Sequence, residues 1–103
     1  MKTVKVIYTA RPAFVAENQQ NIQQVMSDLQ KLNADIRYTV CLGADGKTFM
    51  HLAFFRTEED HKILMQLPSF NHFQVELKAK GLEAPPQQES MEVIGSSKPI
   101  FND

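Results

Sequence analysis

The sequence has one cysteine, no tryptophan, four glycines and almost no net charge, and each shortage excludes a class of protein. A single cysteine, Cys41, excludes an internal disulfide and a zinc site built from cysteines. We expect Cys41 to be a reduced core thiol, because free cysteine commonly behaves as a small buried hydrophobe. The 11 basic and 12 acidic residues nearly cancel, so no bulk field attracts a polyanion or an acidic membrane. Without a glycine-rich phosphate loop, binding of ATP or a dinucleotide is disfavoured.

Long hydrophobic runs are also missing, which bears on location and domain organisation. No apolar segment approaches the roughly 20 residues that cross a bilayer, and Met1-Lys2-Thr3 leads into a short alternating run rather than a signal peptide. We therefore expect a cytoplasmic protein with no membrane partner. The length of 103 residues predicts one domain over 1–103, with a polar tail over 97–103.

Two apolar runs joined by Ala44-Asp45-Gly46-Lys47 predict a β-hairpin over 35–55. Asp-Gly is typical of a type I′ turn, and either a two-residue or a four-residue loop gives the same pairing parity. One face of the hairpin then carries Ile36, Tyr38, Val40, Leu42, Phe49, His51, Ala53 and Phe55. The other face carries Arg37, Thr39, Cys41, Met50, Leu52 and Phe54. Both faces are too apolar for water, so we expect both to be covered.

The segments around the hairpin alternate between strand and helix patterns. Residues 3–11 alternate and stop at Pro12, which predicts a strand, and residues 14–33 carry the apolar stripe of an amphipathic helix. Thr57 is a predicted N-cap, and Pro68 is expected to break the helix before Ser69 caps a second segment. The predicted inward side chains of these two segments are Ile63, Leu64, Leu67, Phe70, Phe73 and Leu77. Residues 83–89 are expected to form a loop, and residues 91–96 a last strand.

The resulting order, β-α-β-β-α-β, predicts an α+β, ferredoxin-like fold: a four-stranded antiparallel sheet with the helices on one face. Its second apolar face needs another cover. Leaving four or five large side chains in water forfeits about 1.5 to 3 kcal/mol each. A second copy of the chain is the economical solution, so we predict a homodimer.

The chain resembles the dimeric α+β barrel superfamily, and within it the antibiotic-biosynthesis-monooxygenase-like branch. The resemblance rests on the strand order and on the segments Lys47–Leu52, Phe55-Arg56-Thr57, His61 and Ser69–Phe73. It implies that two sheets close into a barrel across a dimer, and that each subunit keeps a pocket between its helices and its sheet. Members of that branch include cofactor-free oxygenases of aromatic substrates, haem-degrading enzymes, isomerases and proteins with no known reaction.

The sequence departs from the haem-degrading members of this family. Those enzymes use an asparagine on the first strand, a tryptophan on the third strand and a histidine on the last helix. This chain has no tryptophan, and Lys5 or Ile7 occupies the region of the asparagine. From the resemblance only His72 carries over as a candidate catalytic residue, and we expect neither haem nor any other cofactor.

His51 is the main candidate for chemistry, because an imidazole in the middle of an apolar strand loses solvation. Burial would lower its pKa and keep it neutral at pH 7, the state that a general base needs. The alternative is a buried histidine bonded to a backbone carbonyl or across the dimer contact. Tyr8 and Tyr38 are candidate ligand-orienting hydroxyls, although buried tyrosines with ordinary partners explain them equally well. Phe55 is a further candidate ligand contact.

A metal site is not expected. His61 and His72 are eleven residues apart, close to three helical turns, but Pro68 lies between them and interrupts the alignment. His72 lies opposite the predicted apolar stripe of its helix, so an exposed position is the alternative to a role in a site. We expect no His-x-x-x-His pair and no His-Glu pair on one helical face.

Three functions follow from these patterns. The first is a cofactor-free monooxygenase or isomerase that acts on a small aromatic compound, with His51 as base. The second is a non-enzymatic dimer that binds a ligand or serves in a stress response. The third is an RNA-binding module, because residues 47–54 partly match the aromatic motif of RNA-recognition domains. Both glycines of that motif are missing and His51 replaces its second aromatic residue, so we expect no nucleic-acid partner.

Overall fold

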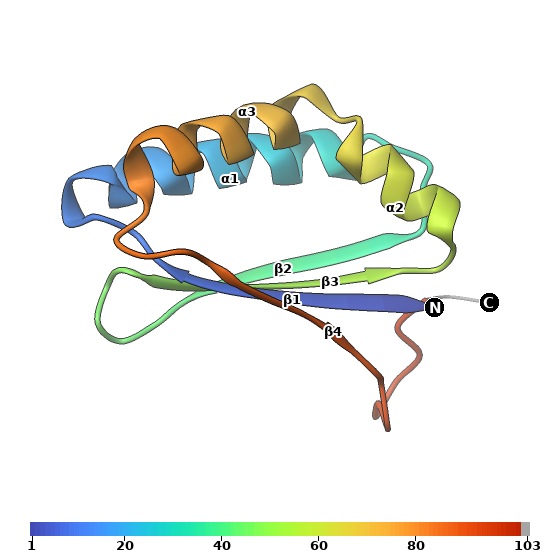
Figure 1. Cartoon of the computed structure of the whole chain (residues 1–103). Coiled ribbons are helices and arrows are strands. Elements are labelled where there is room, and N and C mark those ends of the chain that lie inside the picture. Colours follow the sequence, from blue (N-terminus) through green and yellow to red (C-terminus); the bar gives the residue numbers. More distant parts are fainter. Residues whose placement is uncertain (102–103) are drawn as a thin grey trace.

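The computed structural model describes residues 1–101 and shows one antiparallel sheet with all helices on one side (Figure 1). The elements are β1 (Lys2–Thr9), α1 (Val15–Gln30), β2 (Ile36–Leu42), β3 (Thr48–Phe55), α2 (Glu58–Met65), α3 (Pro68–Glu76) and β4 (Gln87–Met91). A 3₁₀ turn (Pro12–Phe14) precedes α1, and a π-helical turn (Leu77–Gly81) follows α3. The strand order is β2-β3-β1-β4, which confirms the predicted ferredoxin-like α+β fold. No helix within 1–101 is long and apolar enough to span a bilayer.

The β2–β3 hairpin has the predicted pairing but a different turn. Val40 pairs with His51 in the β2–β3 ladder, as the parity argument requires. The loop is the longer, four-residue form, because the backbone N–H of Gly43 donates to the Thr48 carbonyl at 2.7 Å. Gly46 has a φ of 76° and is the only described residue with a positive φ, so a type I′ turn, which needs two, is not formed. The Asp45 carboxylate closes the loop by accepting the Thr48 N–H at 2.8 Å.

The helices cover the sheet face that carries His51, and this face holds the core. The buried apolar residues are Tyr8, Ala10, Phe14, Ile22, Val25, Phe49, Ala53, Phe55, Leu64, Phe70, Phe73 and Leu77. On the outer face Met50, Leu52 and Phe54 are half-buried. Cys41 is exposed on that face, so the prediction of a core thiol is wrong for the single subunit. Cys41 lies on the face of β2 that points away from the helices. The presence of a single cysteine does not reveal which face of the sheet it occupies.

The second helical layer begins largely as predicted. Thr57 caps α2 through a capping box with Asp60, which confirms the predicted N-cap. Phe70, Phe73 and Leu77 are buried as expected, whereas Ile63 is exposed. Ser69 does not cap α3, because the helix begins at Pro68 itself with Leu67 as the N-cap residue. Proline suits this first position, since its fixed φ is helical and its missing N–H would have no partner there.

The last strand lies earlier than predicted. β4 covers Gln87–Met91, so it begins inside the expected loop and shares only Met91 with the predicted strand, while residues 92–96 form no strand. β4 is an edge strand whose five residues are all exposed, so it is held by backbone pairing to β1 rather than by an apolar face. Of the predicted polar tail, Phe101 is buried, and residues 102–103 lie outside the described residues. The Phe101 ring lies beneath the guanidinium groups of Arg37 and Arg56, at 5.7 and 5.1 Å from its centroid.

Candidate functional site

A buried chain of hydrogen bonds joins three of the predicted residues on the helix-covered face. β3 lies between β1 and β2, so a central His51 is flanked by Tyr8 on one side and Tyr38 on the other. The Tyr8 hydroxyl lies 2.7 Å from His51 Nε2, and the Tyr38 hydroxyl lies 2.8 Å from His51 Nδ1. Both ring nitrogens are therefore occupied by phenol groups.

Asn18 extends this chain from the helix layer. Its Nδ2 donates to the Tyr8 hydroxyl at 2.8 Å, and the side chain is fully buried. Its Oδ1 has no hydrogen-bond partner among the described residues. Sequence reasoning missed Asn18. The available signal was its spacing, because Asn18 lies four and seven residues before Ile22 and Val25 on the apolar stripe of α1.

The electrostatics of the site keep all three titratable groups neutral at pH 7. Burial lowers the pKa of His51 to about 4. Burial also raises the pKa of the Tyr8 phenol and of the Tyr38 phenol well above the usual value. A neutral imidazole has one donor nitrogen and one acceptor nitrogen, so one tyrosine donates to His51 and the other accepts from it. Because Asn18 already donates to the Tyr8 oxygen, Tyr8 is placed to donate to Nε2, and Nδ1–H to donate to Tyr38.

Aromatic packing holds the imidazole in place. The Phe73 ring from α3 stacks on His51 with centroids 5.3 Å apart, and Phe49 stacks on Tyr8 at 5.4 Å. Phe70 meets Tyr38 edge-on at 6.4 Å. These contacts restrict all three hydrogen-bonding rings, so the geometry of the network is set by the core.

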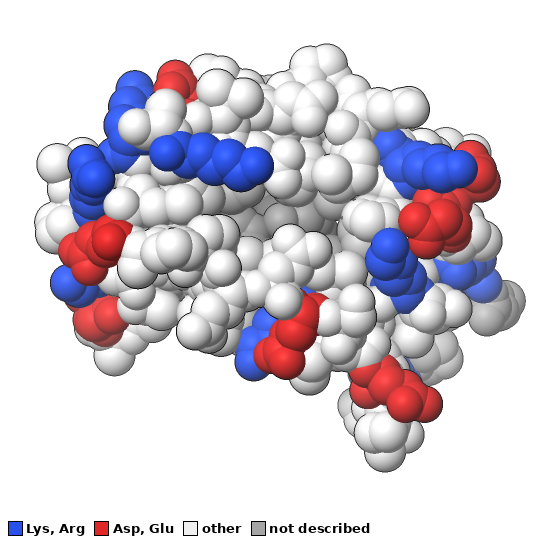
Figure 2. All heavy atoms as spheres, in the orientation of Figure 1, with Lys and Arg blue, Asp and Glu red and all other residues white. Residues whose placement is uncertain are grey.

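Two adjoining pockets open beside this network. The first, which we call the Tyr8 pocket, has a volume of about 150 Å³, and the second, the Phe55 pocket, about 140 Å³. Both are lined by Val6, Tyr38, His51, Phe70, Gln74 and Gln88. Together they form a depression between α3 and strands β1 and β4, which we call the α3 groove. Figure 2 shows the surface hollowed between the helices and the sheet.

The structure brings four of the five predicted site residues to this groove. Tyr8, Tyr38 and His51 meet through hydrogen bonds, and Phe55 lines the Phe55 pocket. His72 does not join them, because it is exposed on α3 and lines neither pocket.

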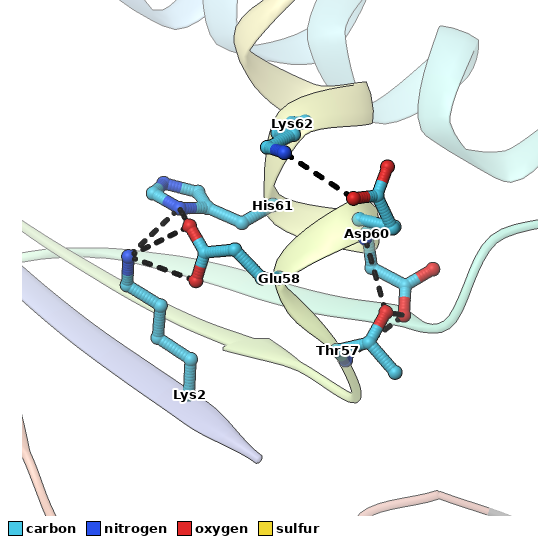
Figure 3. Close-up of polar contacts among 7 residues, drawn as sticks. Lys2, Thr57, Glu58, Asp60, His61 and Lys62 are labelled. Atoms are coloured by element: carbon cyan, nitrogen blue, oxygen red, sulfur yellow. Dashed lines mark hydrogen bonds and ion pairs between the residues drawn. The ribbon is translucent and has the colours of Figure 1, made fainter.

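His61, which the sequence analysis used for the family resemblance and weighed as a metal ligand but did not name as a site residue, lines the Phe55 pocket. Its ring packs on Phe55 with centroids 4.6 Å apart. Its Nδ1 lies 3.0 Å from Lys2 Nζ and 3.4 Å from Glu58 Oε1 (Figure 3). The prediction that no His-Glu pair shares a helical face is therefore wrong, because Glu58 and His61 are three residues apart on α2 and lie on the same side of it. The part of the chain that the structure describes has no group of three metal-ligating side chains, and the absence of a cofactor stays a prediction.

The sequence itself matches no family model and no curated protein. Solved structures do match. An antibiotic biosynthesis monooxygenase has a TM-score of 0.79 at 9% identity, over 92% of this chain and 100% of that one. SnoaB from Streptomyces nogalater, a cofactor-independent oxygenase, has a TM-score of 0.73 at 13% identity, over 95% and 97%. Rv0793 from Mycobacterium tuberculosis has a TM-score of 0.78 at 12% identity, over 94% and 98%.

The chain has the fold of the antibiotic biosynthesis monooxygenases. The resemblance inferred from the strand order and the short motifs is thus confirmed at the level of the fold. At these identities the likeness concerns the backbone arrangement, and the chemistry has to be argued from the residues of this chain.

Proposed function

We propose that the protein is a homodimeric α+β barrel that binds a small aromatic compound in the α3 groove and removes a proton from it, as a cofactor-free monooxygenase or isomerase. The observation that carries this proposal is a neutral, buried imidazole held between two tyrosine hydroxyls beside an apolar pocket. Apolar pockets with a few converging polar groups are the usual form of small-molecule sites. The cofactor-independent activity named for SnoaB is consistent with it.

In this proposal Tyr8 relays the proton. Both nitrogens of His51 are occupied, so a substrate hydroxyl gives its proton to the Tyr8 oxygen while the Tyr8 proton passes to Nε2. The products are a substrate anion and an imidazolium, and Tyr8 is a neutral phenol before and after. Tyr38 accepts from Nδ1–H, so its own proton is free to donate to the oxyanion. A donor aimed at developing negative charge is a large source of rate acceleration.

The two reaction types differ in what the anion does next. In an isomerase, the proton taken from the hydroxyl oxygen returns from the imidazolium to a ring carbon of the anion, which converts the phenol to its keto tautomer. In a monooxygenase, the electron-rich anion reduces dioxygen as co-substrate. A ring methylene then becomes a carbonyl, and its two hydrogens leave with the second oxygen atom as water. A pKa of about 4 makes His51 a weak base in the empty pocket. A bound anion raises that pKa, because opposite charges favour the charged forms of both groups.

The homodimer is proposed from the outer face of the sheet. Met50, Leu52 and Phe54 form an apolar row on β3 that the helices do not cover, and they are half-buried in the single chain. Isologous pairing of two such faces would bury both rows at once. This arrangement would also place the exposed Cys41 inside the interface.

The second candidate is a ligand-binding protein without catalysis. It is favoured by the same hydrogen bonds, because both His51 nitrogens are already satisfied within the protein, as in a structural histidine. The RNA-binding alternative loses its basis. Phe49 and His51, which occupy the positions of the stacking aromatics, are buried against the helices and cannot receive a base.

The test measures ligand binding and turnover separately. Purified protein is screened with hydroxylated two-ring and three-ring aromatics for oxygen consumption and for proton exchange. We expect His51→Ala to lower turnover by about 10²- to 10⁴-fold, the usual contribution of general acid–base catalysis. Circular dichroism would show that the variant is folded, and Asn71→Ala, an exposed change on α3, serves as the control. Binding without turnover in every protein would favour the second candidate, and binding of no aromatic compound would contradict both.

A further inference from the structure

Lys78 gives the Tyr8 pocket a charge that its walls do not neutralise. Among the described residues lining that pocket it is the only one with a formal charge, since His51 is neutral at pH 7. Lys78 has no ion pair or hydrogen bond to any residue within 1–101. An unpaired ammonium beside an apolar wall attracts an anionic group on whatever enters.

Lys80, two residues further along the chain, forms the ion pairs that Lys78 lacks. Lys80 Nζ lies 3.1 Å from a Glu17 carboxylate oxygen and 3.7 Å from one of Glu76. Lys80 lines neither pocket of the groove. The two lysines are therefore a matched pair: two residues apart, with one charge satisfied inside the protein and one facing the groove.

The opposite end of the groove is electrostatically balanced. At the Phe55 pocket Lys2 Nζ lies 3.4 Å from Glu58 Oε1, and both contact His61 Nδ1 (Figure 3). Among the described residues that line the groove, the unbalanced positive charge therefore lies at the Lys78 end. A ligand with one anionic group would bind in a single direction along the groove.

The size of the groove limits the rest of the ligand. The two pockets measure about 150 and 140 Å³. An apolar cavity of about 150 Å³ holds one benzene ring. The amides of Gln74 and Gln88 line both pockets and offer donors and acceptors between them. The space fits a compact two-ring aromatic with a hydroxyl group facing the tyrosines.

We infer that the natural ligand is an aromatic carboxylate whose acid group is bound by Lys78. A carboxylate fits this end better than a phosphate does, because a single ammonium with two nearby amides lacks the several donors that phosphate sites use. This inference rests on the proposed aromatic ligand of the groove and narrows its chemical class. It assigns to Lys78 a role in specificity, distinct from the proton transfer at His51.

The experiment compares 6-hydroxy-2-naphthoate with its methyl ester, which has the same rings and hydroxyl but no charge. Isothermal titration calorimetry measures both affinities for the wild-type protein, for Lys78→Gln and for Lys80→Gln. We expect the wild type to prefer the acid by about five- to tenfold, typical of a partly exposed charge-assisted contact. Lys78→Gln should bring the two affinities within about twofold, and Lys80→Gln should keep the wild-type preference. The preference should also weaken at high salt.

Each of the other possible results would contradict one specific part of this inference. Equal affinities of acid and ester for the wild type would remove the carboxylate while leaving aromatic binding, and with it the proposed function, in place. An equal loss of preference in both lysine variants would remove the specific role of Lys78. No binding of either compound to the folded protein would contradict the aromatic ligand, and so the proposed function itself.

Discussion

The two faces of the sheet are built from the same strands but differ in how fully their side chains are buried. On the helix-covered face His51, Tyr8 and Tyr38 satisfy one another, and aromatic rings fill the space around them. On the outer face Met50, Leu52 and Phe54 are only half-buried, the neighbouring β2 side chains are exposed, and Phe101 gives local cover. One chain therefore covers its site face, whereas its helices leave the apolar row of the outer face uncovered.

The largest expected effect compares one side chain from each face. Phe49 is almost fully buried under Tyr8, so Phe49→Ala should lower the free energy of unfolding by about 3 to 5 kcal/mol. Leu52→Ala on the outer face should cost about 1 kcal/mol in a dilute monomer. Denaturant titration at two protein concentrations measures both. A cost for Leu52→Ala that grows with concentration would indicate that a dimer covers this face, and equal costs in dilute protein would break the comparison.

The second effect is the pH dependence created by His51. Its pKa is about 4 in the folded state and about 6.5 when unfolded, so the unfolded state binds more protons between these values. Folding stability should therefore be intact above pH 6.5 and fall as the pH drops toward 4, by at most about 3 kcal/mol. Subtracting the pH profile of His51→Gln isolates this contribution from the carboxylates. A difference profile that is flat over this range would contradict a buried neutral imidazole.

A charge on the outer face should separate the proposed dimer. Leu52→Lys would place an ammonium within the apolar row, at a cost of about 2 kcal/mol or more in each subunit of a dimer. Sedimentation velocity should show monomers for this variant and dimers for the wild type. Gln23→Lys, an exposed position on α1, is the control for added charge. A wild-type protein that is monomeric at micromolar concentration would contradict the proposed assembly.

The smallest expected effect concerns Phe101, whose ring covers part of the outer face. Phe101→Ala removes a buried ring that lies beneath Arg37 and Arg56, and cation–π contacts are worth about 0.5 to 1 kcal/mol each. From the two contacts we expect a loss of about 1 to 2 kcal/mol in thermal or denaturant unfolding. The affinity for a groove ligand should stay unchanged, because Phe101 lines neither pocket. A change in that affinity would show that the two faces of the sheet are energetically coupled and would contradict this expectation.

The sequence predicted the features that depend on local pattern. Alternation and parity placed Tyr38 and His51 on one face, and the β3–β1 register then brings Tyr8 beside them. Asn18 was missed because a polar residue on an apolar helical stripe acquires meaning only when its partner across the core is known. The predicted position of β4 was wrong because this edge strand is held by backbone pairing to β1. Its side chains are all exposed, so they show no apolar pattern from which the strand could be predicted.

The sequence alone also could not predict that the charge of Lys78 is unpaired. Lys78 and Lys80 look equivalent in the sequence, and only the rotation of the turn after α3 directs one to Glu17 and the other to the groove. Contacts between distant elements decide such differences. They decide which charge faces the groove more than they decide the fold, which is why the fold was predictable and the charge at the groove was not.

The most direct test of the site is the protonation state of His51 measured by ¹⁵N nuclear magnetic resonance of the imidazole. At pH 7 we expect one protonated and one unprotonated ring nitrogen, with no titration until the pH approaches about 4. Tyr8→Phe and Tyr38→Phe should each shift a different ring nitrogen, Nε2 and Nδ1 respectively. A His51 that titrates near pH 6.5, or whose nitrogens respond to neither tyrosine, would contradict the buried network on which the proposed function depends.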